Sequence, residues 1–469
     1  MNNRIASIDV LRGLAIFFMV LSGNIAWNSG LPAWMFHCQV PPPDFIFNPD
    51  IKGITWVDLV FPFFIFSMGA SMPFSLGGKI RKGFSTAHIS LDIIKRWITL
   101  AAFGLVLGNA NAIFSYEEPL KILTRFGIWL GLFLALWRVP EKSKVKPTLI
   151  NLSGVLVLIA LFLVIKFGFK ANLSFSQNNI IIMILSMLAL VGGFIWIITK
   201  DKPWLRAVIF LAICALKEMA WHTELLKWAA LPESISWLLN WNYVQYLVIT
   251  LIGMSVGDIL RKARDRQESM CIEPQATFSL ISALLCFLMI PVILWAMFTR
   301  HVTVAMGVTV VAALAQIFIT RGFESSPKNR IARMGYLLLA LGILFDPIDG
   351  GITKDHCNLS YMLTTGGLAC LMTSFLLWCE SALAIAGHKL SINFTLVGQN
   401  PMVAYTLSVL VLNPLFYAIG LGSIVDTASV GNPFIGLVRG LIITLAMMAV
   451  TCILSKNKIN LLNGKNKIT

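Results

Sequence analysis

The chain has 469 residues, of which 57% are hydrophobic and 13% are charged, and its mean hydropathy is +0.79. Because a soluble domain carries about 25% charged residues, this composition excludes a disordered chain and disfavours a water-soluble globule. The formal net charge of +15 would suit a nucleic-acid-binding protein, but membrane proteins gather Lys and Arg in their cytoplasmic loops. We therefore predict an all-α polytopic membrane protein that lies in a lipid bilayer and has no nucleic-acid partner.

Long apolar runs follow one another with short connections. Each is close to the roughly 20 residues that cross a bilayer as a helix, so they predict about 14 transmembrane helices in one domain over residues 1–469. The first run resembles a signal peptide, but it contains Asp9 and Arg12 and lacks a small-residue cleavage site, so we expect a retained helix. The expected helices cover residues 8–27, 55–77, 90–109, 120–138, 148–167, 178–199, 204–221, 241–260, 277–298, 302–320, 331–346, 360–385, 394–418 and 432–455.

The positions of Lys and Arg indicate an orientation for these helices. If the N-terminus is cytoplasmic and every expected helix spans the membrane, about 27 of the 37 basic residues lie on the inner side. A wrong helix count would scramble this alternation between loops. The bias therefore predicts that the N-terminus and the C-terminus are both cytoplasmic.

The expected outer loops hold a different set of residues. The longest, residues 28–54, contains His37 and a stiff run of three prolines. Residues 110–119 and 346–359 form two further outer loops with several acidic side chains. Because long structured loops often carry function, these loops are where we expect part of the site.

Two His-Cys pairs, His37-Cys38 and His356-Cys357, fall on these outer loops. If the loops met, two His and two Cys could hold a tetrahedral zinc ion. A disulfide between Cys38 and Cys357 is the alternative on an oxidising side of the membrane. Adjacent residues point in different directions and rarely bind one ion together, so we predict no metal site.

Several polar residues stand inside or at the ends of the expected helices, where charge is costly and usually has a partner. Asp9 and Arg12 are three positions apart on one helical face. They could form a local ion pair or neutralise a phosphate-bearing ligand at the inner mouth. Asn24 lies near the outer end of the same helix, where an interhelical hydrogen bond is the alternative to a role in the site.

Three further positions open helices. Asp58 lies in the first turn of the helix 55–77, where the helix dipole favours a carboxylate. Arg125 lies in the first turn of the helix 120–138, where a cation gains nothing from the dipole, so a specific partner such as an acidic group or a substrate oxygen is expected. Asn400 precedes Pro401, which is typical of a helix N-cap.

His37 is the most informative of these residues, because the chain has six histidines and this one lies beside the helix ends that carry Asn24 and Asp58. A neutral imidazole is the usual general base near pH 7. The alternative is a histidine with a purely structural role in its loop.

Two stretches of sequence together resemble a known family. IDVLRG runs from Ile8 to Gly13, and TWVDLVFPFFIFSMG runs from Thr55 to Gly69. Weaker matches are LTRFG at 123–127, Pro232-Glu233, Leu359-Ser360-Tyr361 and GQNP at 398–401. In this order they resemble the heparan-α-glucosaminide N-acetyltransferase family and its bacterial relatives of the DUF5009 type, although this chain has a longer segment between His37 and Gly53 and more expected helices.

The resemblance implies an acetyl-CoA-dependent transmembrane acyltransferase. It would move acetyl from cytosolic acetyl-CoA to the amino group of a terminal glucosamine, as in heparan sulfate, or of a free amino sugar, on the extracytoplasmic side. It implies His37, Asn24 and Asp58 as catalytic residues, Arg12 and Arg125 as residues that bind acetyl-CoA, and Asp9 and Asn400 as residues that bind substrate. A bacterial inner membrane is the expected location, and a homodimer is a further expectation from the resemblance.

Two other functions fit the same polar residues. The first is a transporter of amino sugars or cell-wall fragments, which would also have buried polar groups and acidic outer loops. The second is an O-acyltransferase that acts on envelope glycans. Binding of CoA separates the transferases from the transporter, and the linkage in the product separates the two transferases.

Overall fold

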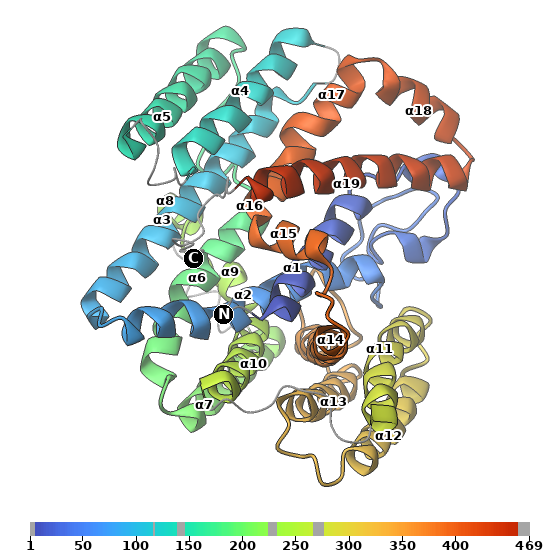
Figure 1. The fold of residues 1–469 in the computed structure, drawn as a ribbon. Coiled ribbons are helices and arrows are strands. Elements are labelled where there is room, and N and C mark those ends of the chain that lie inside the picture. The colour runs from blue at the N-terminus through green and yellow to red at the C-terminus, as the bar shows by residue number, and fades with distance from the viewer. Residues whose placement is uncertain (1–4, 116–117, 138–145, 224–231, 266–275, 458–469) are drawn as a thin grey trace. The chain divides into compact units, whose positions relative to one another are not determined.

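The computed structural model describes residues 5–115, 118–137, 146–223, 232–265 and 276–457, and this part of the chain has an all-α fold (Figure 1). The first half of the helices is α1 (Ala6–Ser22), α2 (Trp56–Arg81), α3 (Thr86–Ala110), α4 (Pro119–Leu136), α5 (Pro147–Leu163), α6 (Ile180–Thr199), α7 (Pro203–His222), α8 (Glu233–Ser236), α9 (Trp241–Val244) and α10 (Leu247–Asp265). The second half is α11 (Ala276–Phe298), α12 (Val302–Ile319), α13 (Pro327–Phe345), α14 (Leu359–Ile385), α15 (Ile392–Gln399), α16 (Pro401–Leu407), α17 (Asn413–Ala418), α18 (Leu421–Ser429) and α19 (Pro433–Lys456).

Each of the 14 expected ranges overlaps a helix, but three of them are divided. The range 148–167 contains α5 and a π-helical turn, η4 (Val164–Gly168). The range 241–260 contains the short α9 and the long α10. The range 394–418 contains α15, α16, a π-helical turn η5 (Ser408–Leu412) and α17, because Pro401 and Pro414 each stand at the start of a new helix. Helices α8 and α18 lie outside the expected ranges.

Within the described residues, ten helical segments are long and apolar enough to cross a membrane, so the protein is a multi-pass membrane protein. Helices α1, α3, α7 and α13, which correspond to the other four expected spans, are outside this set. The 17 residues of α1 extend about 26 Å, which is less than a hydrocarbon core of roughly 30 Å. The total of about 14 spans and the cytoplasmic termini stay predictions.

The chain forms two compact units, and each consists of segments that are far apart in the sequence. Unit 1 contains residues 1–11, 33–101 and 181–390, and unit 2 contains residues 12–32, 102–180 and 391–469. Helix α1 therefore contributes its first residues to unit 1 and the rest to unit 2.

In unit 1, helices α2 and α10 lie against each other at glycines. A Cβ atom on Gly253 would lie 2.1 Å from the backbone oxygen of Phe66, and a Cβ atom on Gly69 would lie 2.3 Å from that of Thr250. Such close approach of two backbones is typical of small residues between transmembrane helices. Helices α13 and α14 also pack side by side in this unit (Figure 1).

Unit 2 has its own packed pairs, chiefly α4 with α5 and α15 with α19. The backbones of α4 and α5 approach closely at Gly154, where a Cβ atom would lie 2.2 Å from the nitrogen of Ala135. Arg439 on α19 links three elements of the unit: it donates to the backbone oxygen of Asn24 at 2.9 Å and to the hydroxyl of Tyr417 at 2.9 Å, and it pairs with Asp426 at 2.7 Å.

Candidate functional site

His37 lies in the long loop between α1 and α2, two residues after the short 3-10 turn η2 (Ala33–Met35). Its side chain is 40% exposed, and its Nδ1 atom lies 2.7 Å from Oδ1 of Asp58. Because a carboxylate only accepts hydrogen bonds, this contact favours a proton on Nδ1 and leaves Nε2 as the basic nitrogen. His37 and Asp58 therefore form a dyad of the kind that orients a histidine base.

Asp58 is held in place by the start of α2. Its Oδ2 atom accepts hydrogen bonds from the backbone N–H of Thr55 at 2.9 Å and from that of Cys38 at 3.4 Å, and with Thr55 it forms a capping box. The side chain is fully buried, and the positive end of the helix dipole stabilises its charge. One carboxylate thus caps the helix with one oxygen and orients His37 with the other.

Lys354 is the third charged group at this place. Its Nζ atom lies 3.2 Å from Nδ1 of His37 and 3.9 Å from Oδ1 of Asp58. Lys354 comes from the loop between α13 and α14, 317 positions after His37. Tyr361, in the first turn of α14, donates its hydroxyl to the backbone oxygen of Asp58 at 2.7 Å, so this second loop and the following helix are both attached to the dyad.

The loop that carries Lys354 is fixed at several points. Arg300 forms a bidentate pair with Asp346 at 2.9 and 2.7 Å. Asp346 also accepts from the N–H of Ile352 at 2.7 Å, and the oxygen of Ile352 accepts from the N–H of Gly53 at 2.8 Å. These contacts join residues 346–358 to the loop of His37.

A second contact joins the two loops at their exposed side. Nε2 of His356 lies 2.9 Å from Oδ1 of Asp50. The two loops thus meet, an arrangement that the sequence raised only as a condition for a zinc site. Cys38 and Cys357 are not joined by a disulfide.

Both thiols are buried and free. Burial raises the pKa of Cys38 to about 12, with the charge of Asp58 acting in the same direction, and burial raises the pKa of Cys357 to about 12. Among the described residues, no group of three or more His, Cys, Asp and Glu is placed to hold a metal ion.

A further polar cluster supports the base of the same loop. Nζ of Lys217 donates to Oε1 of Gln245 at 2.7 Å and to the backbone oxygen of His356 at 3.1 Å. Asp349 accepts from the N–H of Ser360 at 2.6 Å. Burial raises the pKa of Asp349 to about 6, and the neighbouring carboxyl of Glu218 raises it further.

The other predicted catalytic residue, Asn24, belongs to unit 2. It is buried, and its side-chain amide donates to the backbone oxygen of Val20 at 2.6 Å. This contact uses one of the two N–H bonds of the amide. The backbone oxygen of Asn24 accepts from Arg439, so the residue is fixed in the turn that follows α1.

The predicted residues for acetyl-CoA also lie in unit 2 and contact backbone carbonyls. Arg12 donates to the oxygen of Gly398 at 3.0 Å. Arg125 is fully buried, lies over the ring of Phe114 at 4.9 Å, and donates to the oxygen of Val409 at 2.8 Å in the π-helical turn η5. A phosphate oxygen could accept from a guanidinium in the same way, so these contacts alone assign no ligand.

The two predicted substrate residues are both buried. Asp9 is in the first turn of α1 and belongs to unit 1. Asn400 stands at the N-cap position of α16, as the sequence indicated, but its side-chain amide donates to Oγ of Ser455 at 3.4 Å and does not cap the helix.

Of the predicted site residues, His37 and Asp58 are brought into direct contact. Lys354 was missed as a site residue. The signal that could have found it was its position in a predicted outer loop, because Lys and Arg are expected mainly in cytoplasmic loops.

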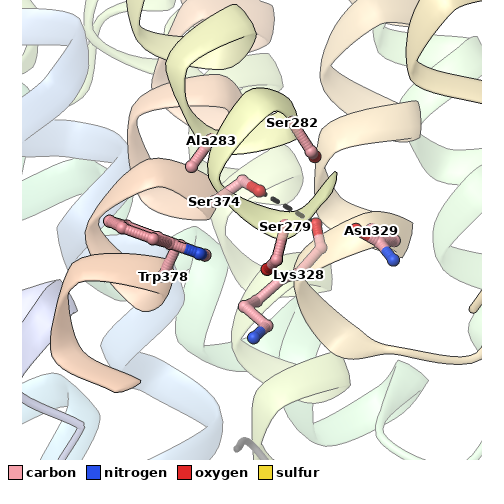
Figure 2. Close-up of a pocket in the computed structure, with 7 residues that line it drawn as sticks. All are labelled: Ser279, Ser282, Ala283, Lys328, Asn329, Ser374 and Trp378. Carbon is pink, nitrogen blue, oxygen red and sulfur yellow. Dashed lines mark hydrogen bonds between the residues drawn. The ribbon is translucent and has the colours of Figure 1, made fainter. Parts of the chain in front are cut away.

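A small pocket lies among α11, α13 and α14 (Figure 2). It is lined by buried Ser279, Ser282, Lys328 and Ser374, and the hydroxyl of Ser374 donates to the backbone oxygen of Lys328 at 3.0 Å. Lys328 and Asp346 mark opposite ends of α13, about 27 Å apart at 1.5 Å per residue. The pocket is therefore separate from the dyad.

Comparisons with known proteins relate the chain to a family and to two curated enzymes. The family described as "Domain of unknown function (DUF5009)" matches residues 4–260. Heparan-alpha-glucosaminide N-acetyltransferase of Mus musculus is 30% identical over 112 residues, and that of Homo sapiens is 29% identical over 111 residues. Each alignment covers 23% of this chain, and the chain spans 14% of the length of these curated relatives.

Proposed function

This chain belongs to the DUF5009 family, and we propose that it is an acetyl-CoA-dependent transmembrane N-acetyltransferase. It takes acetyl from cytosolic acetyl-CoA and transfers it to the amino group of a glucosamine-type sugar on the extracytoplasmic side of a bacterial inner membrane. The observation that carries the proposal is the contact of His37 with the buried carboxylate of Asp58 at 2.7 Å. The partial similarity to two N-acetyltransferases supports the reaction type.

The dyad suits attack of an amine on a thioester. The amine nitrogen attacks the thioester carbonyl, so a C–N bond forms and the C–S bond breaks. Nε2 of His37 accepts the proton of the amine and returns it to the sulfur of CoA, which leaves as the thiol. In the other route, Nε2 attacks the thioester carbonyl and the C–S bond breaks, so that CoA leaves as the thiolate and takes up a proton. The amine then attacks the acetyl-imidazole, the bond from acetyl to Nε2 breaks, and the proton of the amine passes to the released imidazole. Both routes need an unprotonated Nε2.

For the remaining predicted residues we propose the roles that the family resemblance implies. Asn24 supplies an amide donor to the oxyanion. Arg12 and Arg125 bind phosphate groups of CoA, and Asp9 and Asn400 bind polar groups of the substrates. These assignments rest on the family resemblance and on the residue types.

The test uses membranes that contain the full-length protein, acetyl-CoA with a labelled acetyl group, and glucosamine. We expect N-acetylglucosamine as the product, identified by mass spectrometry and NMR. His37→Ala should lower the turnover rate by roughly a hundredfold or more, because a positioned base contributes about 10²–10⁴ to the rate. The matched control is His88→Ala, which changes a half-exposed histidine that contacts Asp92 and should leave the rate near that of the wild type.

Absence of acetyl transfer, or a full rate in His37→Ala, would contradict the proposal. Thermal unfolding with and without CoA then distinguishes the transporter. Saturating CoA at about a hundred times its Kd stabilises a protein that binds it by about 2.7 kcal/mol. Uptake of amino sugar without stabilisation by CoA would assign transport, and an O-acetyl product would assign the chain to the O-acyltransferases.

A further inference from the structure

The Nδ1 atom of His37 has two charged neighbours that make opposite demands on it. The carboxylate of Asp58, at 2.7 Å, can only accept a hydrogen bond, whereas the ammonium of Lys354, at 3.2 Å, can only donate one. A single ring nitrogen either carries a proton or lacks one, so it cannot satisfy both neighbours.

The distances decide which neighbour Nδ1 bonds. At 2.7 Å, a carboxylate oxygen facing a lone pair would be strongly repelled, and this distance is typical of a charge-assisted hydrogen bond. Nδ1 therefore carries the proton and bonds Asp58. The ammonium of Lys354 then acts on the dyad through its charge, at 3.9 Å from Oδ1 of Asp58.

We propose that Lys354 is a positioning residue that keeps the imidazole of His37 neutral. With Lys354 in place, the charges of Asp58 and Lys354 cancel, and a proton added to His37 makes the cluster cationic. Without Lys354, the added proton would neutralise the charge of Asp58 instead. The lysine thus opposes protonation of Nε2, the atom that must be unprotonated in the reaction proposed above, on which this inference rests.

Other titratable and charged groups lie around the dyad, and two of the charged ones are paired with partners of their own. Arg300 is held by Asp346 in a bidentate pair, and His356 is paired with Asp50. Within the described residues, Lys354 is the cation that contacts both His37 and Asp58. The remaining groups that face this cluster are Cys38, Tyr246, Asp355, Cys357 and Tyr361.

Two hydrogen bonds order the backbone around Lys354. The oxygen of Lys354 accepts from the N–H of Cys357 at 2.9 Å, and the N–H of Thr353 donates to Oδ1 of Asn358 at 3.3 Å. The side chain is only 22% exposed.

The experiment measures acetyl transfer against pH for the wild type, Lys354→Met and Lys354→Arg. Methionine keeps the length of the side chain and removes the charge. We expect the acid limb of the Lys354→Met rate profile to move to higher pH by about one unit, in line with the effect of a charge within 4–6 Å. Lys354→Arg keeps the charge and should retain the wild-type position of the limb.

Lys52→Met is the matched control. Lys52 lies in the loop of His37, and its aliphatic chain approaches Gly351 of the loop that carries Lys354. Removal of the charge of Lys52 should leave the acid limb of the rate profile unchanged. A wild-type profile in Lys354→Met would overturn the inference, because a lysine that only anchors the loop would change the yield of folded protein and not the position of the limb.

A second measurement needs no catalysis. Diethylpyrocarbonate modifies unprotonated imidazole, and His37 is exposed enough to react. The midpoint of modification against pH, followed by mass spectrometry, should move upward in Lys354→Met. If His37→Ala retains activity, the proposed function fails while this titration still tests the electrostatic role. If His37→Ala is inactive and the midpoint does not move, the role of Lys354 alone is wrong.

Discussion

At the scale of single residues, Asp58 performs two tasks that usually need two side chains. Oδ2 caps the first turn of α2 through the N–H of Thr55, and Oδ1 holds His37. The capping position fixes the carboxylate to a rigid helix, so the imidazole is oriented by secondary structure as well as by its own loop. A site on such an element is better defined than one on loops alone.

Asp58→Asn separates the two tasks. The amide oxygen of Asn can still cap the helix, but the amide cannot act as an anionic partner for His37. We therefore expect a turnover rate lower by roughly a hundredfold or more, with a thermal unfolding midpoint close to that of the wild type. Acetyl transfer and thermal unfolding of the same preparations measure the two effects.

The control for this substitution is Asp92→Asn. Asp92 pairs with Lys79 at 2.7 Å and is partly exposed. Asp92→Asn makes the same change from carboxylate to amide at a residue that does not belong to the dyad. Asp92→Asn should change the turnover rate and the thermal unfolding midpoint little. Equal loss of rate in both variants would show that the loss does not come from the dyad.

The sequence predicted part of this site. His37 and Asp58 could be found because a histidine in a long loop and an acidic residue in a first helical turn each have a local chemical meaning. Lys354 could not be placed in the same way, because its contact depends on the path of a loop more than 300 residues further on, held by Arg300 and Asp346. No local pattern encodes that path.

At the scale of elements, the dyad depends on helices packed at very short distances. Helix α2 carries Asp58 and lies on α10, with Gly69 facing the backbone oxygen of Thr250. Each of the two helices also packs against other helices, so neither can move away from the other without losing those contacts. The position of Asp58 is therefore set by this packed pair.

Gly69→Ala tests the packing. The new Cβ would lie 2.3 Å from the oxygen of Thr250, so the helices must separate, and overpacking of this kind costs about 1–3 kcal/mol. We expect a lower thermal unfolding midpoint in detergent. Gly78→Ala on the same helix meets nothing within 4 Å and should be neutral or stabilising, by up to about 1 kcal/mol; equal destabilisation by both changes would contradict the packing argument.

The sequence predicted the helices themselves better than their interruptions. Apolar runs specify where helices form, and all 14 ranges overlap one. The range 394–418, expected as one helix, contains three helices and a π-helical turn. It is divided because Asn400-Pro401 and Asn413-Pro414 interrupt an otherwise apolar stretch. The nine residues of α18 are too few to give a membrane-spanning signal.

At the scale of the whole molecule, the distribution of basic residues predicts which side of the membrane each loop faces. The turn between α2 and α3 is predicted to be cytoplasmic, and the loop of His37 is predicted to be extracytoplasmic. Each has an exposed apolar residue that is suitable for labelling: Phe84 is 44% exposed and Ile46 is 71% exposed.

Cysteine labelling checks this orientation. In intact spheroplasts, a membrane-impermeant maleimide should label Ile46→Cys, whereas Phe84→Cys should be labelled only after permeabilisation. The background is a variant in which Cys271 and Cys379 are replaced by Ser, because Cys379 is partly exposed, whereas Cys38 and Cys357 are buried. A fluorescent reporter that is silent outside the cytoplasm should remain bright when fused to the C-terminus. The reverse labelling pattern would invert the topology, and a dark fusion would overturn the even number of spans.

The separation of 317 positions between His37 and Lys354 also has a consequence for biosynthesis. At about 5–20 residues per second, the ribosome makes Lys354 roughly 15–60 s after His37. During that interval the nascent chain contains the histidine and its carboxylate without the balancing ammonium. Translation must therefore pass α13 before Lys354 exists, so a chain stalled earlier would lack the cation proposed above to oppose protonation of His37.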